Sequence, residues 1–167
     1  MKKIIIILTF VIGLQTYAQK TFEVYNYTNV TIKLTDIITR SGISLPEYHS
    51  KPFGNITIAP GGSYTLVNNT FVFRFPFNSP SSVPFITKWE RLNANGTITP
   101  NIASNVAWTL GNSQVFYNLK FFDGANILRE VGPTSAILPV PISGGFFADY
   151  SFSNPAANVF FYTIVVY

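Results

Sequence analysis

The chain has 167 residues, of which 47% are hydrophobic, 16% aromatic and only 11% charged, with a formal net charge of +4 and no cysteine. After residue 18 the basic side chains are dispersed singly, which excludes the clustered positive charge of a nucleic-acid-binding protein. The lack of cysteine excludes disulfides, thiol catalysis and thiolate metal sites.

Residues 1–18 have the pattern of a secretory signal peptide. Lys2 and Lys3 precede an apolar run over residues 4–14, and a small residue, Ala18, stands at the expected cleavage point. A secretory peptidase recognises this combination of a basic start, an apolar run of about 7–15 residues and a small-residue junction. We therefore expect cleavage near Ala18, a bacterial export route and a secreted, periplasmic or cell-surface protein. Its formal charge falls from +4 to +2 when the two lysines are removed.

Residues 30–35 have the alternation of a half-buried strand. Ile32 and Leu34 point to one face and the polar residues beside them point to the other. Residues 55–66 show the same alternation on both sides of a Pro-Gly-Gly sequence at residues 60–62. We expect two short strands there, joined by a turn.

Four phenylalanines alternate along the next extended segment, which is expected to end or to run along a sheet edge at Pro76, because proline cannot donate to a strand ladder. On one face of a sandwich strand such a row belongs to the core. An exposed row would be a contact surface larger than monomers usually leave bare, with the polar loop at residues 78–84 as its rim. The row consists of Phe71, Phe73, Phe75 and Phe77.

Two hairpins are predicted from dipeptides that favour two-residue turns. The first joins residues 85–92 to residues 97–99 through Asn95-Gly96, and the second joins residues 115–122 to residues 126–131 through Asp123-Gly124.

The last third of the chain alternates strands with proline and glycine breakers. Residues 136–142 contain two prolines, which predicts an edge strand or an extended crossing. A strand over residues 146–152 follows, bounded by the Asn-Pro pair at residues 154–155. The closing segment, Val159–Tyr167, is apolar on both faces, which predicts a central strand covered on both sides or a strand covered by a partner. As an exposed edge it would recruit another chain, so self-association through it is an alternative.

The whole pattern predicts an all-β protein. No segment after the leader keeps an apolar period of 3.6 residues through three helical turns, and aromatic, β-branched and turn residues dominate. Turn signals recur about every 8–15 residues, which predicts roughly nine or ten short strands. We therefore expect residues 19–167 to form a single antiparallel β-sandwich domain of the jelly-roll or immunoglobulin-like type.

Groups that could perform catalysis are scarce. His49 is the only histidine and lies in a proline-flanked stretch that reads as a solvated loop, while the seven acids show no paired spacing of a glycoside hydrolase. Residues 123–126 offer two side-chain oxygen ligands, but a calcium loop usually offers more carboxylates, and a hairpin turn accounts for this sequence. We predict no catalytic residue, no cofactor and no metal site.

Trp89 and Trp108 are the best candidates for a binding site, because flat aromatic rings stack on sugar rings, although large aromatic residues more often belong to cores. Together with the row from Phe71 to Phe77 they are the predicted binding residues. These features favour a non-catalytic binding or adhesion domain whose partner is a glycan or a protein. Two alternatives are a structural subunit that assembles through its last strand, and a membrane-active β protein, either a pore-former or a small outer-membrane barrel.

Overall fold

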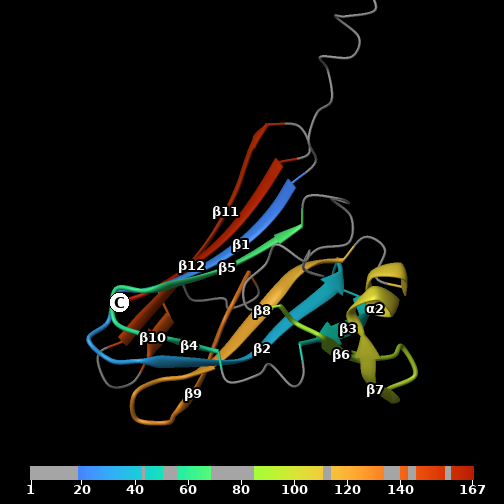
Figure 1. Cartoon of the computed structure of the whole chain (residues 1–167), viewed down its shortest axis with the longest axis horizontal. Coiled ribbons are helices and arrows are strands. Elements are labelled where there is room, and N and C mark those ends of the chain that lie inside the picture. Colours follow the sequence, from blue (N-terminus) through green and yellow to red (C-terminus); the bar gives the residue numbers. More distant parts are fainter. Residues whose placement is uncertain are drawn as a thin grey trace, which may run out of the picture.

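The computed structural model describes residues 19–42, 44–50, 56–68, 85–110, 114–133, 140–142, 146–156 and 159–167. The leader at residues 1–18 and the row from Phe71 to Phe77 lie outside the described residues. The described chain is mostly β, with two sheets and one short helix (Figure 1). Neither described sheet closes on itself, and the arrangement is consistent with a β-sandwich, as the sequence predicts.

One sheet has five strands in the order β10-β11-β12-β1-β5. Its first and last strands in the chain, β1 and β12, are neighbours and run parallel, whereas the other pairs are antiparallel. The prediction of a purely antiparallel sandwich is therefore wrong, because strand alternation carries no information about direction. The bounds are β1 Gln19–Asn26, β5 Ser63–Asn68, β10 Val140–Ile142, β11 Phe146–Ala156 and β12 Val159–Val166.

The second sheet has seven strands in the order β7-β6-β3-β2-β8-β9, and β4 also pairs with β2. The described chain thus forms twelve strands, more than the nine or ten expected. The strand β3 is unexpected, because the sequence around Pro46 and His49 predicts a loop. The bounds are β2 Ile32–Ser41, β3 Ser44–His49, β4 Thr57–Ile58, β6 Lys88–Leu92, β7 Ile98–Ala103, β8 Val115–Phe122 and β9 Leu128–Val131.

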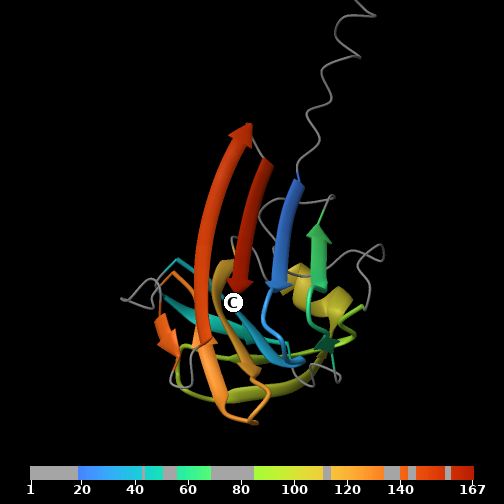
Figure 2. The same ribbon diagram turned by 90° about the vertical axis from the view of Figure 1, so that its left-hand side faces the viewer.

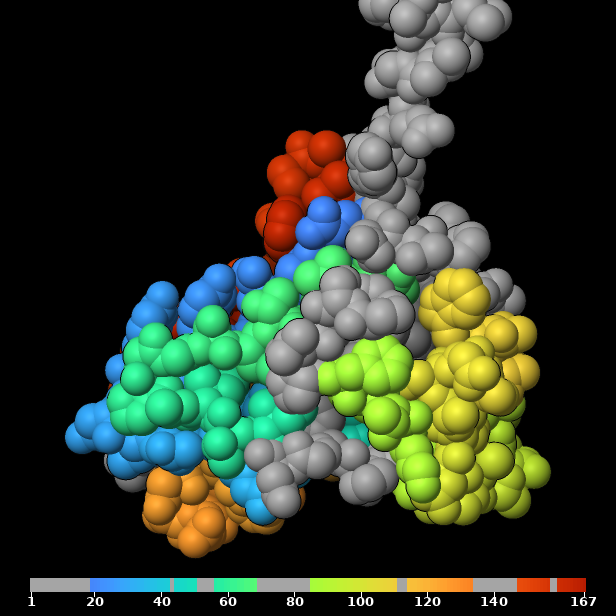
Figure 3. Space-filling view, in the orientation of Figure 1, coloured from blue at the N-terminus to red at the C-terminus, as the bar shows by residue number. Residues whose placement is uncertain are grey.

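A short helix, α2 (Ser104–Leu110), follows β7 and buries Ala107 against the core. Its seven residues make only two turns, too few for an apolar period to be recognised in the sequence. The helix forms one end of the molecule in Figure 3, and the β8–β9 hairpin lies toward the opposite end. In the described ranges, no helix has the length and apolar character that a membrane crossing requires.

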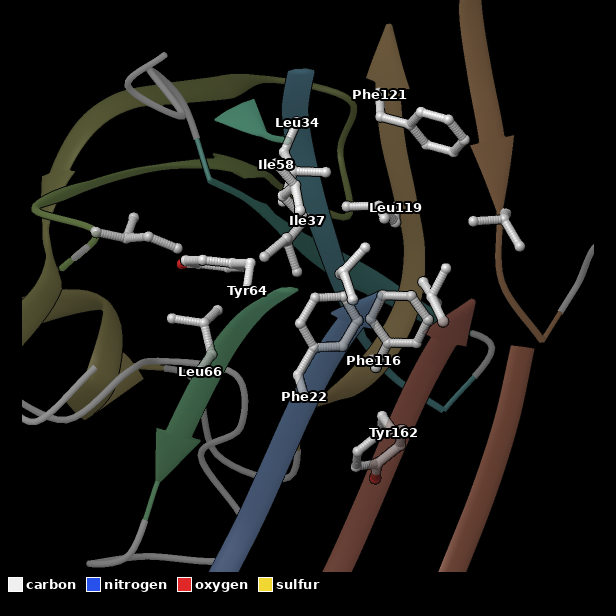
Figure 4. Close-up of a cluster of buried hydrophobic side chains, with 14 of the residues drawn as sticks. Phe22, Leu34, Ile37, Ile58, Tyr64, Leu66, Phe116, Leu119, Phe121 and Tyr162 are labelled. Atoms are coloured by element: carbon white, nitrogen blue, oxygen red, sulfur yellow. The ribbon is translucent and has the colours of Figure 1, made fainter. Parts of the chain in front are cut away.

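The core lies between the two sheets and follows the predicted alternation. Ile32 and Leu34 of β2 are buried, whereas Lys33 between them is exposed. The rings of Phe22 and Phe116 come from opposite sheets and pack with their centroids 4.8 Å apart. Burial of each such side chain stabilises the fold by about 1.5–3 kcal/mol. Figure 4 shows the cluster, with Phe22, Leu34, Ile37, Ile58, Tyr64, Leu66, Phe116, Leu119, Phe121 and Tyr162 labelled.

Both predicted hairpins are present, but their loops have three residues instead of two. In the β6–β7 hairpin the amide of Asn93 donates to the carbonyl of Thr97 (2.9 Å), and Gly96 takes the left-handed conformation with φ 80°. In the β8–β9 hairpin the amide of Asp123 donates to the carbonyl of Ile127 (3.1 Å). In each loop the third residue is left-handed, which characterises a type I turn closed by a bulge.

Gly124, in the second hairpin, is needed for a reason other than the turn conformation that the sequence suggests. The left-handed residue there is Asn126, with φ 58°, and not Gly124. A Cβ atom on Gly124 would lie 2.8 Å from the Cβ atom of Val30. Gly124 is therefore required by the close approach of the loop that follows β1, and not by its own backbone conformation.

The closing strand β12 is central in its sheet, as predicted. The predicted cover on both of its faces is not seen among the described residues, because alternate side chains along it are only half-buried. The strand is hydrogen-bonded to β11 on one side and to β1 on the other over almost its whole length. Another chain could pair with its edge only by displacing one of these two strands. For residues 136–142 the sequence predicts an edge strand or an extended crossing. The short strand β10 lies at the sheet edge, and residues 136–139 are outside the described residues.

Two of the connections that carry the chain from one sheet to the other lie close together, one from β1 to β2 and one from β4 to β5 (Figure 1). The fully buried amide of Asn26 joins them: its Nδ2 donates to the carbonyl of Val30 in the first connection (2.8 Å) and to that of Ile58, the last residue of β4 before the second (2.9 Å). Its Oδ1 accepts from the amide (3.1 Å) and the hydroxyl (2.6 Å) of Thr28. One side chain therefore bonds to the first of these connections and to the residue after which the second begins.

We expect Asn26→Ala to lower the free energy of unfolding by about 2–4 kcal/mol, because it leaves buried carbonyl and hydroxyl groups without their partner. The exposed neighbour Asn29 offers a matched control, and Asn29→Ala is expected to change stability by less than about 0.5 kcal/mol. Urea denaturation followed by tryptophan fluorescence measures both variants. Equal stability of the two variants would contradict the assigned role of Asn26.

Candidate functional site

The predicted tryptophans do not form a shared exposed surface. Trp89 on β6 is fully buried, and its Nε1 donates to Oγ of Ser104 (3.2 Å). Its ring therefore has no surface on which a sugar could stack in this conformation. Trp108 lies on α2, half-buried against the core. The remaining predicted binding residues, from Phe71 to Phe77, are not among the described residues.

The only histidine belongs to a buried charge network, and the expectation of a solvated loop histidine is wrong. His49 is the last residue of β3, and its Nδ1 lies 2.7 Å from Oδ2 of Asp36 on the neighbouring strand β2. Its Nε2 lies 2.9 Å from Oε2 of Glu47, whose other oxygen pairs with Arg40. Asp36 and Glu47 are both buried, at 2% and 5% exposure. We call these four residues the histidine network.

The geometry of this network disfavours catalysis by the histidine. Both ring nitrogens of His49 are engaged by carboxylates, so neither is free to accept a proton from a nucleophile. The nearby hydroxyl of Ser50 accepts a hydrogen bond from the amide of Ile37 (2.6 Å) and is fully buried. Burial opposes protonation of His49, but its hydrogen bonds to Asp36 and Glu47 outweigh this effect and raise its pKa.

Both oxygens of the Asp123 carboxylate accept hydrogen bonds from groups of its own hairpin. Its Oδ1 accepts from the amides of Ala125 (2.9 Å) and Ile127 (3.0 Å), and its Oδ2 accepts from Nε (2.9 Å) and Nη2 (2.8 Å) of Arg129. Burial opposes ionisation, but these donors outweigh it and hold the pKa of Asp123 below its ordinary value. The hairpin thus accounts for this carboxylate without a bound ion.

Among the described residues, one face of the five-stranded sheet packs against the other sheet, and no other described element covers the opposite face. In β1, Phe22 and Val24 are buried between the sheets, so Glu23 and Tyr25 point to the opposite side. We call this opposite side of β1, β5, β11 and β12 the outer face. Figure 2 shows these four strands side by side in front of the seven-stranded sheet, with no described element over them.

Four aromatic residues gather at one end of the outer face, and we call Tyr25, Tyr27, Phe147 and Tyr167 the aromatic patch. The rings of Tyr25 and Tyr27 stack 6.1 Å apart, and those of Phe147 and Tyr167 stack 5.9 Å apart. The amide of Tyr27 donates to the carbonyl of Val166 (2.7 Å), which brings the two pairs together at the ends of β1 and β12. The exposed fractions of Tyr27, Tyr167 and Phe147 are 63%, 43% and 38%.

Two carboxylates accompany the aromatic patch. The hydroxyl of Tyr25 donates to Oε2 of Glu23 (3.1 Å), and the hydroxyl of Tyr167 donates to Oδ2 of Asp149 (2.7 Å). Burial and the hydrogen bond to Glu23 raise the pKa of Tyr25, and the hydrogen bond to Asp149 raises that of Tyr167. Because both phenols stay protonated, they hold the two carboxylates at fixed positions beside the rings.

The outer face also carries a row of small polar side chains. Ser151, Thr163, Glu23 and Thr65 are consecutive cross-strand partners from β11 to β5. The face therefore combines flat rings, hydroxyl groups and carboxylates on a rigid sheet. Sequence reasoning missed this site, because the pairing of β1 with β12 joins residues from the two ends of the chain. The alternation of Tyr25 and Tyr27 was the one local signal.

Comparisons with known proteins do not identify a family for this chain. A scan of the sequence against protein-family models gives no match, and a search among curated proteins gives no significant match either.

We expect His49→Gln to lower the free energy of unfolding by about 3 kcal/mol at about pH 6, because two buried carboxylates lose their shared cation. A raised folded-state pKa stabilises the fold fully below the unfolded value of 6.5, and this contribution is lost as pH rises through the folded value. The difference between the wild type and His49→Gln should therefore shrink as the pH rises above 6.5. Urea titrations across this range measure it, and a difference that stays constant with pH would contradict the charged network.

Proposed function

We propose that this protein is an exported, non-catalytic binding domain that recognises a glycan on the outer face of its five-stranded sheet. The observation that carries the proposal is the aromatic patch, in which Tyr27, Tyr167 and Phe147 are exposed at 63%, 43% and 38%. Aromatic rings gain free energy when they are buried, so three of them together on an open sheet favour a contact surface.

The chemistry of the outer face suits a sugar ring. Flat apolar ring faces can cover the C–H face of a pyranose, while hydroxyl and carboxylate groups can bond to its hydroxyls. The outer face has both: the rings of Tyr27 and Tyr167, the carboxylates of Asp149 bonded to Tyr167 and of Glu23 bonded to Tyr25, and the hydroxyl of Thr163, the cross-strand partner of Glu23. Tyrosine also loses little conformational entropy on binding, because it has few rotatable bonds.

The hydrogen bonds and ion pairs of the titratable groups support a function in binding rather than in catalysis. The only histidine has both nitrogens engaged by carboxylates, and Asp123 is held by four donors. Within the described ranges, no group of three or more histidine, aspartate or glutamate side chains is placed to hold a metal ion. We therefore propose a function in adhesion or capture rather than in hydrolysis.

Export and domain organisation complete the proposal. We propose that residues 1–18 are removed by a secretory peptidase and that residues 19–167 act as one sandwich domain of the jelly-roll or immunoglobulin-like type. Such a domain would act in the periplasm, at the cell surface or outside the cell. A low content of charged residues, 11% of the chain, is compatible with binding through aromatic and hydroxyl groups.

A glycan array probed with the purified protein tests this function. We expect binding, and we expect Tyr27→Ala and Tyr167→Ala each to weaken it about tenfold, since each removes a stacking ring worth about 1.4 kcal/mol. Ile98→Ala is the matched control, because Ile98 on β7 is also exposed, at 58%, but belongs to the other sheet. Binding that is lost equally in all three variants, or no binding to any glycan, would refute the proposal.

A further inference from the structure

The charges of the outer face are all of one sign among the residues that the structure describes. Glu23 and Asp149 lie on it, whereas the described lysines and arginines lie elsewhere. Lys20 is buried between the sheets, with Nζ 3.4 Å from the carbonyl of Gln114 and over the ring of Phe160. The others are on strands of the seven-stranded sheet: Lys33, Arg40, Lys88, Arg91, Lys120 and Arg129.

The two carboxylates differ from the other strongly bonded acids of the described chain. Asp36, Glu47 and Asp123 each contact a histidine or an arginine. Glu23 and Asp149 instead form no ion pair with a described residue, and each accepts a single hydrogen bond from a tyrosine. A carboxylate has room for further donors on its second oxygen, so both acids can still accept from a ligand.

We infer that the glycan bound by the outer face carries protonated amines, as a polymer of amino sugars with free amino groups does. This inference rests on the proposed function and names the class of its ligand. An ammonium group is attracted both by the face of a tyrosine ring and by a carboxylate, and Glu23 and Asp149 each stand beside such a ring. A polyanionic glycan would be repelled by the same two groups.

A polysaccharide fits this surface better than a basic protein does. The aromatic patch lies on one side of a sheet, and its rings form two nearly parallel pairs with interplanar angles of 17° and 21°. The row of Ser151, Thr163 and Thr65 adds hydroxyl groups that can exchange hydrogen bonds with sugar hydroxyls. Protein interfaces instead rely on an anchor side chain in a pocket.

Two ligands that differ in whether their amino groups are free and charged or acetylated and neutral test the inference: the β-1,4-linked hexamer of glucosamine and the hexamer of N-acetylglucosamine. Calorimetry with the purified protein should give tighter binding of the amine form, and this binding should weaken with added salt because charges contribute to it. Glu23→Gln and Asp149→Asn should each weaken it about fivefold and leave binding of the acetylated form nearly unchanged. Glu130→Gln, at a half-exposed carboxylate on the other sheet, is the control.

Circular dichroism and thermal unfolding of each variant show whether it is folded before its binding is interpreted. Equal affinities for the two hexamers, with no effect of Glu23→Gln or Asp149→Asn, would overturn the amine inference and leave the glycan-binding function standing. Absence of binding to either hexamer, with binding of an oligolysine peptide that depends on Tyr27 and Tyr167, would overturn both and identify a basic protein as the partner.

Discussion

The buried amide of Asn26 is the interaction on which the arrangement of this molecule depends. Its four hydrogen bonds reach Thr28, Val30 and Ile58, and so hold the β1–β2 connection against the end of β4, where the chain leaves for β5. The backbone of Asn26 also exchanges hydrogen bonds with Gly61 and Gly62, at the start of β5. Because Tyr25 and Tyr27 flank it in the chain, the same anchor fixes half of the aromatic patch on the outer face. A buried polar group that satisfies every partner specifies one geometry, whereas an apolar residue would tolerate several.

The charged groups discussed above are of two kinds: those paired with an opposite charge inside the protein, and those on the surface without such a partner among the described residues. The histidine network and the Asp123 hairpin are of the first kind, since neighbouring strands and turns compensate their charges. Buried charges require such compensation, because an unpaired ion in the interior is strongly destabilising. Glu23 and Asp149 lie on an open surface, bonded only to tyrosine hydroxyls among the described residues. This contrast separates groups that maintain the fold from groups that are available to a ligand.

Much of the fold follows from local sequence patterns, whereas the candidate site does not. The alternation at Ile32 and Leu34 identifies β2, the apolar run to Tyr167 identifies a central strand, and the two hairpins follow from their turn residues. These features depend on residues that are close in the chain. The parallel pairing of β1 with β12, the strand character around Pro46 and the contacts of His49 depend on partners that are distant in the chain. The aromatic patch depends on them too, because it combines Tyr27 with Tyr167.

The outer face of the five-stranded sheet is the proposed recognition surface, and a crystal structure of the protein with a glucosamine oligomer tests this proposal most directly. We expect sugar rings over Tyr27 and Tyr167, with amino groups close to Asp149 and Glu23, and no change in the hydrogen bonds of Asn26. An outer face covered by another part of the chain, or an oligomer bound beside α2 instead, would contradict the account.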